Sequence, residues 1–303
     1  MNRSPFAHEI RPDVVDMECV ADTRCGVGES PVWSARERCL YFVDILGRVI
    51  HRYQPGGSLE SYPAPELVTA LAPRKAGGLI VSLERSIAFF DPATERFDIV
   101  RRMDEPASNR FNDGKVDRQG RFWAGTMNNT DWDAPHGTLY RFGADVAPVP
   151  MIEHVRCSNG LGWSPDDRTF YFVESFAHTI HAFDYQAGSG SIDRRREFAV
   201  LAPASGAFPD GLTVDAEGYV WSAQPVFGRL VRYNPAGGID RIIETPVSRC
   251  TSCIFGGDDL GTMYVTSARQ SLSPEELRDE PFAGGLFAFR PGVGGIAETP
   301  FSG

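Results

Sequence analysis

Four polar residues occupy one repeated position in the sequence, each four residues before an apolar residue in a β-rich run. They are Glu29 before Trp33, Asn112 before Val116, Asn159 before Trp163 and Asp210 before Val214. Equivalent positions converge when repeated strands are arranged around one axis. Carboxylate and amide oxygens that meet in a narrow channel are costly to bury unless a cation or several waters lie between them. The pattern therefore predicts an oxygen-rich central site.

A divalent cation held by Glu29, Asn159 and Asp210 is the function that this pattern favours, and a hydrated polar plug is the alternative. Oxygen ligands, some of them amides, suit Ca²⁺, Mg²⁺ or Mn²⁺ and are compatible with Fe²⁺. We expect Ca²⁺ first. Zn²⁺ is the least favoured because it normally takes His or Cys ligands. The two remaining repeats offer Thr251 and, beside apolar Val68, Thr69 at this position.

Substrate-binding groups are predicted next to this ring. Arg110 stands two residues before Asn112, and the planar donor fork of Arg beside the mixed donor and acceptor of Asn suits a polyhydroxylated ligand. An arginine packed at the surface is the equal alternative. Two long loops, 127–137 and 267–284, are expected at the same end of the molecule. Asp131 and Trp132 in the first are candidates for a wall or a lid, and solvent exposure is the alternative.

The elements that must position these residues recur six times. Short runs rich in aromatic and β-branched residues follow one another in a fixed order, separated by Gly, Asp, Asn and Pro. The spacing from Glu29 to Thr251 gives about 44 residues per unit, which is typical of propeller blades. The first runs of the six units are Pro31–Trp33, Leu67–Ala72, Asp113–Val116, Gly160–Trp163, Gly211–Val214 and Ser252–Phe255.

We therefore predict an all-β fold, a six-bladed β-propeller with four-stranded antiparallel blades. Long amphipathic helices are missing from the sequence, which excludes α/β barrels and doubly wound sheets; the one helix-like stretch is Pro274–Asp279, capped by Ser273. Residues 1–303 form a single domain with an N-terminal extension over about 1–16. Glu18–Ala21 is expected to close the ring as a strand of the last blade.

Composition limits the partners. The 303 residues carry 30 Lys and Arg against 40 Asp and Glu, a formal charge of −10, which argues against nucleic acid. We expect no membrane contact and a cytoplasmic location, because no signal-like or spanning apolar segment is visible. A monomer or a weak homo-oligomer is expected. Reduced, mostly buried thiols are the simplest interpretation of the six cysteines, and a redox role for Cys250-x-x-Cys253 is a minor alternative.

The chain resembles the SMP-30/gluconolactonase (regucalcin-like) family in motifs that run in order from about Glu18 to the C-terminus. Those motifs are Gly28-Glu29-Ser30-Pro31-Val32-Trp33, Arg110-Phe111-Asn112-Asp113-Gly114-Lys115, Ala124-Gly125-Thr126-Met127, Ser158-Asn159-Gly160-Leu161, Pro209-Asp210-Gly211, Thr251-Ser252-Cys253-Ile254-Phe255-Gly256-Gly257 and Ala283-Gly284-Gly285-Leu286-Phe287. The resemblance implies a six-bladed propeller that hydrolyses sugar lactones with one divalent metal.

The resemblance also implies roles for individual residues. Glu29, Asn159 and Asp210 fall on the family's metal ligands, and Asp210 also falls on its proposed general base. Arg110 and Asn112 fall on substrate contacts. After Gly125-Thr126-Met127, vertebrate members have two glutamates, one of which contacts the sugar, whereas Asn128-Asn129-Thr130-Asp131 follows here. Asn129, Thr130 and Asp131 are therefore the candidates for that contact.

The chemistry predicted for this site is the metal-dependent hydrolysis of a sugar (aldono-) lactone to the aldonic acid. Lactone opening needs an attacking water and a stabilised oxyanion, and a cation on the carbonyl oxygen would act as a Lewis acid. Asp210 or a metal-bound water would activate the nucleophile. Two alternatives remain: an esterase or phosphotriesterase on the same metal site, which would favour an aromatic-lined mouth, and a non-catalytic metal- or sugar-binding regulator.

Overall fold

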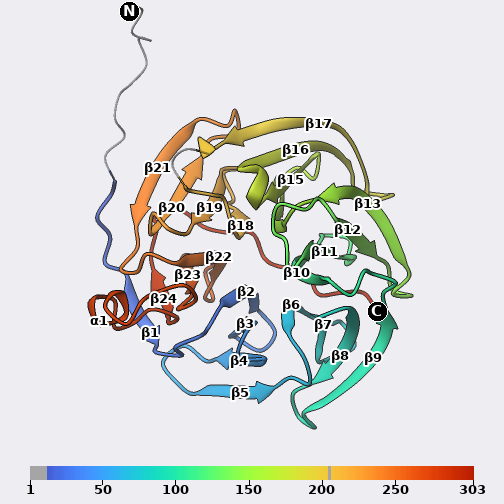
Figure 1. Ribbon diagram of the computed structural model, residues 1–303, viewed down its shortest axis with the longest axis horizontal. Helices are drawn as coiled ribbons and strands as arrows, with labels where there is room; N and C mark the ends of the chain where they lie inside the picture. The colour runs from blue at the N-terminus through green and yellow to red at the C-terminus, as the bar shows by residue number, and fades with distance from the viewer. Residues whose placement is uncertain (1–11, 204–205) are drawn as a thin grey trace, which may run out of the picture.

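Six four-stranded antiparallel sheets surround a central axis in the computed structural model, which describes residues 12–203 and 206–303 (Figure 1). The predicted six-bladed β-propeller is therefore confirmed. In five blades the chain runs outward strand by strand from the axis, so sequence order is also order in space. The first strand of each of these blades lines the centre, as the repeated polar position requires.

The blades comprise the following strands. Blade one holds β2 (Gly28–Ser34), β3 (Cys39–Asp44), β4 (Val49–Tyr53) and β5 (Leu59–Pro63); blade two holds β6 (Val68–Pro73), β7 (Leu79–Leu83), β8 (Ser86–Asp91) and β9 (Arg96–Arg102). Blade three holds β10 (Asn109–Val116), β11 (Phe122–Asn128), β12 (Gly137–Phe142) and β13 (Pro148–Val155); blade four holds β14 (Ser158–Trp163), β15 (Thr169–Glu174), β16 (Thr179–Gln186) and β17 (Ser191–Val200). Blade five holds β18 (Leu212–Val214), β19 (Val220–Gln224), β20 (Arg229–Tyr233) and β21 (Ile239–Glu244); blade six holds β22 (Cys250–Gly256), β23 (Thr262–Ser267), β24 (Leu286–Phe289) and β1 (Glu18–Ala21).

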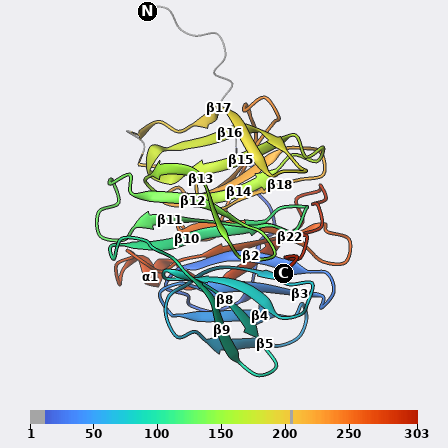
Figure 2. The ribbon, with the colours of Figure 1, turned by 90° about the vertical axis from the view of Figure 1, so that its right-hand side faces the viewer.

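Burial decreases from the axis to the rim, and the strands become less apolar in the same direction. Every residue of the inner strands β2 and β14 is buried, and so is every residue of the second strands β3 and β11. The outer strands β5 and β9 are mostly exposed. Because each blade packs on a neighbour through both faces, its inner strands need apolar residues without the alternation typical of a one-sided sheet. Figure 2 shows the layers of the ring from the side.

The ring closes between the two ends of the chain. Strand β1 pairs antiparallel with β24, with Glu18 opposite Ala288 and Cys19 opposite Phe287. This confirms the closing strand predicted at Glu18–Ala21. Of the predicted N-terminal extension, residues 1–11 lie outside the described residues, and Asp13 forms a parallel bridge with Ile243 of blade five.

The C-terminal segment 290–303 runs across one end of the central channel (Figure 1). Its backbone hydrogen-bonds in turn to blade six at Leu260, blade five at Ala216, blade two at Lys75 and blade three at Gly120. Four blades are therefore tied together at that end, which we call the far end. The opposite end, where the inner strands begin, carries the two long loops, and we call it the mouth.

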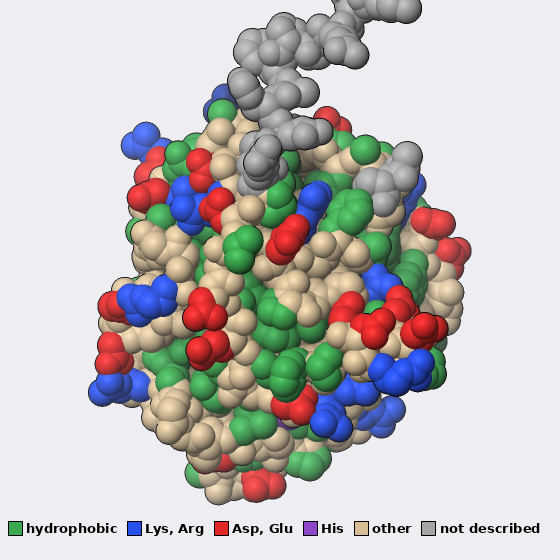
Figure 3. All heavy atoms as spheres, turned by 90° about the vertical axis from the view of Figure 1, so that its left-hand side faces the viewer, with side chains coloured by type: hydrophobic (Ala, Val, Ile, Leu, Met, Phe, Trp, Pro, Cys, Tyr) green, Lys and Arg blue, Asp and Glu red, His purple; other side chains and the backbone are tan. Residues whose placement is uncertain are grey.

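Helical structure is minor in the part of the chain that the structure describes. Helix α1 (Glu276–Asp279) lies at the rim, and the Ser273 hydroxyl accepts a hydrogen bond from the Glu276 backbone, as its predicted capping role requires. A 3₁₀ turn, η1, covers Ser175–Ala177. Within these residues no helix has the length and apolar character needed to cross a bilayer. Acidic and basic side chains are intermingled over the face that carries β1 and β21 (Figure 3).

Candidate functional site

Irregular pairing marks the inner strands at the depth of the predicted site. The register of β2 against β3 shifts between Glu29 and Val32, and the register of β14 against β15 shifts between Asn159 and Leu161. Strand β10 shifts between Phe111 and Gly114. A bulge bends the strand and changes the direction of its side chains. The repeated polar position is thus a repeated bulge.

Glu29 is buried in blade one, and its position depends on an unusual backbone. The carboxylate accepts a hydrogen bond of 2.8 Å from the backbone N–H of Ser30. Ser30 has a φ of 48°, in the left-handed region that residues other than glycine rarely adopt. The Ser30 hydroxyl accepts a bond from the backbone N–H of Leu71 in blade two, which holds this conformation in place. Such local strain inside a strand is typical of functional positions.

Asn159 and Asp210 are in direct contact. The Asn159 Nδ2 donates to Asp210 Oδ1 and, over 3.0 Å, to the hydroxyl of Ser175. A glycine follows each residue where the chain packs closely on the next blade: a Cβ on Gly160 would lie 2.6 Å from the backbone oxygen of Asp210, at the entry to blade five, and one on Gly211 would lie 2.0 Å from Ser252 Oγ of blade six. The Asn-Gly and Asp-Gly pairs of the sequence are therefore packing requirements of the channel.

A third carboxylate, Asp113, belongs to the site and was not predicted from the sequence. It is buried, its Oδ1 accepts a bond of 2.7 Å from the backbone N–H of Gly114, and its charge acts on both Glu29 and Asp210. The signal in the sequence was its place directly after Asn112, in the same bulge. Asn112 itself turns to blade four, where its Nδ2 donates to the backbone oxygen of Ser158 over 2.9 Å.

Burial and mutual repulsion make the three carboxylates difficult to ionise together. Burial, followed by the charges of Asp210 and Asp113, raises the pKa of Glu29 well above its ordinary value. Burial and then Asp113 raise the pKa of Asp210 to about 8, against the hydrogen bonds from Asn159 and Gly211. Burial raises the pKa of Asp113 to about 6. Concentrated negative charge of this kind is stabilised by a cation.

The donor set fits a hard divalent cation. Glu29 and Asp210 supply carboxylate oxygens, and Asn159 supplies an amide oxygen once the amide turns, because its nitrogen now faces Asp210 and its oxygen accepts from the Gly160 N–H. Over residues 12–203 and 206–303, no cluster of three or more His, Cys, Asp and Glu side chains has metal-binding geometry. In such a site the amide of Asn159 would be the third ligand.

Arg110 lies near the carboxylates, and its guanidinium uses Nε and Nη1 but not Nη2 for hydrogen bonds within the described residues. Its Nε donates to Asn129 Oδ1 over 2.8 Å, and its Nη1 donates to Asn112 Oδ1 and to the backbone oxygen of Phe111, each over 2.8 Å. Burial lowers the pKa of Arg110, while the charges of Cys157, Glu29 and Glu84 oppose that shift. The hydrogen bonds fix the plane of the guanidinium, and no acceptor for Nη2 is found among the described residues.

Thr130 and Asp131, the other predicted substrate contacts, are exposed in the blade-three loop. Asn128 organises them: its Oδ1 accepts from the backbone N–H and hydroxyl of Thr130 and from the backbone N–H of Asp131, over 2.9–3.0 Å. Of the four residues that replace the vertebrate glutamates, it is Asn129 that contacts Arg110. Of the three candidates, Asn129 is therefore the one joined directly to Arg110.

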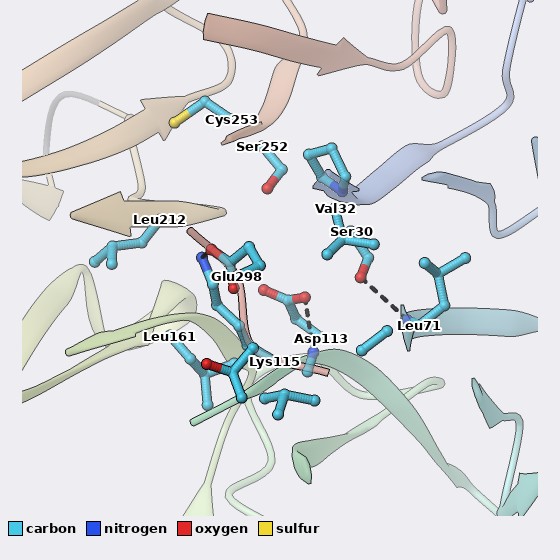
Figure 4. Close-up of a pocket in the computed structure, with 15 residues that line it drawn as sticks. Ser30, Val32, Leu71, Asp113, Lys115, Leu161, Leu212, Ser252, Cys253 and Glu298 are labelled. Carbon is cyan, nitrogen blue, oxygen red and sulfur yellow. Dashed lines mark hydrogen bonds and ion pairs between the residues drawn. The ribbon is translucent and has the colours of Figure 1, made fainter. Parts of the chain in front are cut away.

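The far end of the channel is closed beneath the carboxylates. A cavity of about 30 Å³, enough for one or two waters, lies between the inner strands and the C-terminal segment (Figure 4). Its polar lining comprises Ser30, Asp113, Lys115, Ser252 and Glu298. Lys115 Nζ lies 3.1 Å from the Glu298 carboxylate, and both side chains are largely buried.

The Cys250-x-x-Cys253 pair has no redox geometry. Both thiols are free and lie in the apolar core between blades five and six. Burial raises the pKa of Cys250 to about 11 and that of Cys253 to about 12, so neither is the thiolate that redox chemistry requires. Burial disfavours the minor alternative, and packing in the core accounts for the motif.

Comparison with known proteins agrees with the fold and identifies the family. Residues 27–269 match the family model described as the SMP-30/Gluconolactonase/LRE-like region, and the chain belongs to this family. It is 38% identical over 298 residues to regucalcin of Gallus gallus, covering 95% of this chain and 99% of the relative. It is also 38% identical to the 6-deoxy-6-sulfogluconolactonase of Pseudomonas putida over 296 residues, with the same coverages. A solved luciferin-regenerating enzyme superposes with a TM-score of 0.87 at 28% identity, covering 95% of this chain and 99% of that one.

Proposed function

We propose that this chain is a lactonase that hydrolyses a sugar lactone to the aldonic acid with one divalent cation, Ca²⁺ first, held by Glu29, Asn159 and Asp210. The observation that carries the proposal is the cluster of three buried carboxylates, Glu29, Asp113 and Asp210, with the Asn159 amide in contact with Asp210 and the charge of Arg110 acting on Glu29. A gluconolactonase-type relative at 38% identity over almost the whole chain supports the substrate class.

In this proposal Arg110 binds the substrate and Asp210 transfers a proton. A bound divalent cation supplies Lewis-acid stabilisation to the lactone carbonyl oxygen as negative charge develops on it. Arg110 directs its unused Nη2 toward acceptors on the substrate, and Asn129 and Asn112 hold the guanidinium in one plane. Asp210 accepts the proton of the attacking water. The closed far end keeps bulk water on one side of the substrate.

The test is a panel of pentono- and hexonolactones assayed for acid release, with EDTA-treated protein reloaded with Ca²⁺, Mg²⁺, Mn²⁺, Fe²⁺ or Zn²⁺. We expect turnover that depends on the added ion, and a loss of at least about 100-fold in kcat for Asp210→Asn. Asp133→Asn, an exposed carboxylate on the mouth loop, is the control and should match the parent protein.

Two outcomes would contradict the proposal. Hydrolysis above the spontaneous rate in metal-free Asp210→Asn would show that neither the ion nor this carboxylate is needed. No turnover of any lactone with any ion, together with tight Ca²⁺ binding by calorimetry, would favour the non-catalytic binding role instead.

A further inference from the structure

Three aromatic side chains form a continuous surface at the mouth, which we call the aromatic wall: Trp132, Phe176 and Phe208. The rings of Trp132 and Phe176 are stacked, with centroids 5.4 Å apart and planes 5° from parallel. Phe176 meets Phe208 edge to face at 5.8 Å. The three residues come from loops of blades three, four and five, so the wall spans half of the ring.

The aromatic wall is joined to the candidate metal ligands at its inner end. Phe208 stands two residues before Asp210. Phe176 follows Ser175, whose hydroxyl accepts the hydrogen bond from Asn159. At its outer end, Trp132 stands three residues after Asn129, which holds Arg110. Along the chain, the wall residues therefore adjoin the candidate ligands on one side and Asn129, which holds Arg110, on the other.

One face of the Trp132 ring is covered by Phe176, yet 48% of the side chain is exposed. The uncovered face of the indole is thus open to solvent at the mouth. Ligand sites commonly combine aromatic walls with a few fixed polar groups. A sugar lactone matches this combination because its hydroxyls lie at the ring edge, whereas its faces present C–H bonds that are attracted to the electron-rich face of an aromatic ring.

We propose that the aromatic wall is a specificity surface that stacks on the C–H face of the lactone ring while Arg110, held in place by Asn112 and Asn129, binds its hydroxyls. The inference rests on the proposed function. It makes Trp132 a substrate-contacting residue in this chain, at the loop where the sequence departs from the glutamates of vertebrate members.

Fluorescence tests the contact without relying on turnover. The protein has five tryptophans; Trp33, Trp123, Trp163 and Trp221 are each at most 5% exposed, so Trp132 dominates quenching by acrylamide. We expect D-glucono-δ-lactam, a non-hydrolysed lactone analogue, to protect the parent protein from acrylamide. Trp132→Phe should show little quenching and no protection.

Kinetics provides the second measurement. Trp132→Ala should raise KM for D-glucono-δ-lactone about 3- to 10-fold, as expected for a lost aromatic stack, with kcat within about twofold, and Trp132→Phe should restore KM. Phe282→Ala removes another exposed aromatic at the mouth, on the blade-six loop, and should change neither constant.

Failure of this inference is distinct from failure of the proposed function. If the lactam inhibits the parent protein competitively but gives no protection, or if Trp132→Ala leaves KM unchanged, the aromatic wall does not touch the ring. If Trp132→Ala lowers kcat as strongly as it raises KM and Trp132→Phe does not recover, the residue acts only on structure. If the parent protein neither turns over lactones nor binds the lactam, the proposed function is wrong, and the stacking role is wrong as well.

Discussion

Replacing Asp113 with Asn should stabilise the metal-free protein at neutral and alkaline pH. In the folded state the pKa of Asp113 is about 6 instead of its ordinary 3.8, because the carboxyl is buried. Between these two values the folded chain binds more protons than the unfolded chain, so the free energy of unfolding falls as pH rises, and the full penalty is present above about pH 6. At 1.36 kcal/mol per pKa unit, the upper limit is about 3 kcal/mol.

The amide keeps the acceptor that Gly114 uses, so Asp113→Asn removes charge with little change in shape. Because the remaining carboxylates relax when one charge is lost, we expect a gain of about 1–3 kcal/mol near pH 8, or about 2–5 °C in Tm for a chain of this length. The gain should vanish near pH 4, below the pKa of the group in the folded state.

Differential scanning calorimetry of EDTA-treated protein at several pH values measures this effect. Asp133→Asn, which removes an exposed charge on the mouth loop, controls for net charge and should shift Tm by less than about 1 °C. Saturating Ca²⁺ should reduce or reverse the advantage of Asp113→Asn, because a bound cation favours the carboxylate. The reasoning is refuted if Asp113→Asn is no more stable than the parent protein near pH 8 without metal.

Other parts of the molecule give further expected outcomes. Glu298→Gln leaves the largely buried Lys115 unpaired and should lower the free energy of unfolding by about 1–3 kcal/mol in urea, whereas an unchanged midpoint would show that the pair is only a surface contact. Gly125→Ala puts a Cβ 1.8 Å from Ser158 Oγ and should lower the Tm or prevent folding; adding Ser158→Gly should recover much of the loss, and failure to recover would place the strain elsewhere. In native protein only Cys19, the one cysteine that is not buried, should react readily with Ellman's reagent, against six thiols in urea; several fast thiols in the folded state would contradict the observed packing.

The fold was predictable because a propeller repeats its unit. Each blade has a similar order of strands and turns. The pattern of a single blade is weak evidence, but six copies at a constant spacing predict the propeller strongly. The closing strand at Glu18–Ala21 followed from the same count, since the last repeat lacked a fourth strand. The C-terminal segment 290–303 could not be predicted, because it crosses the far end as extended chain with no periodic pattern, and only the assembled ring provides its partners.

The sequence predicted where the site lies in the channel, but it did not predict every side chain that contributes to it. A regular strand alternates its side chains, so a prediction that places Asn112 in the channel turns Asp113 away. The bulge between Phe111 and Gly114 breaks that alternation and brings the charge of Asp113 to bear on Glu29 and Asp210. The aromatic wall was beyond sequence reasoning for another reason: its rings come from three loops, and only Trp132 stood out, as a possible wall or lid residue.

Six equivalent positions face the channel, and they carry different side chains. The polar groups of the site therefore come from some blades and not from others. In blade two, Thr69 Oγ1 pairs with Ser82 Oγ at 2.8 Å. In blade six, Thr251 Oγ1 pairs with Thr266 Oγ1 at 2.9 Å and donates to the backbone oxygen of Gly28 in blade one, so both hydroxyls already have partners in the protein. The charged and amide groups come from blades one, three, four and five. Because a cation held by Glu29, Asn159 and Asp210 would use oxygens from only three blades, its remaining coordination positions would be open to a substrate. Arg110 and the aromatic wall flank that opening, which is why the proposed chemistry belongs to the mouth and the closed far end serves stability.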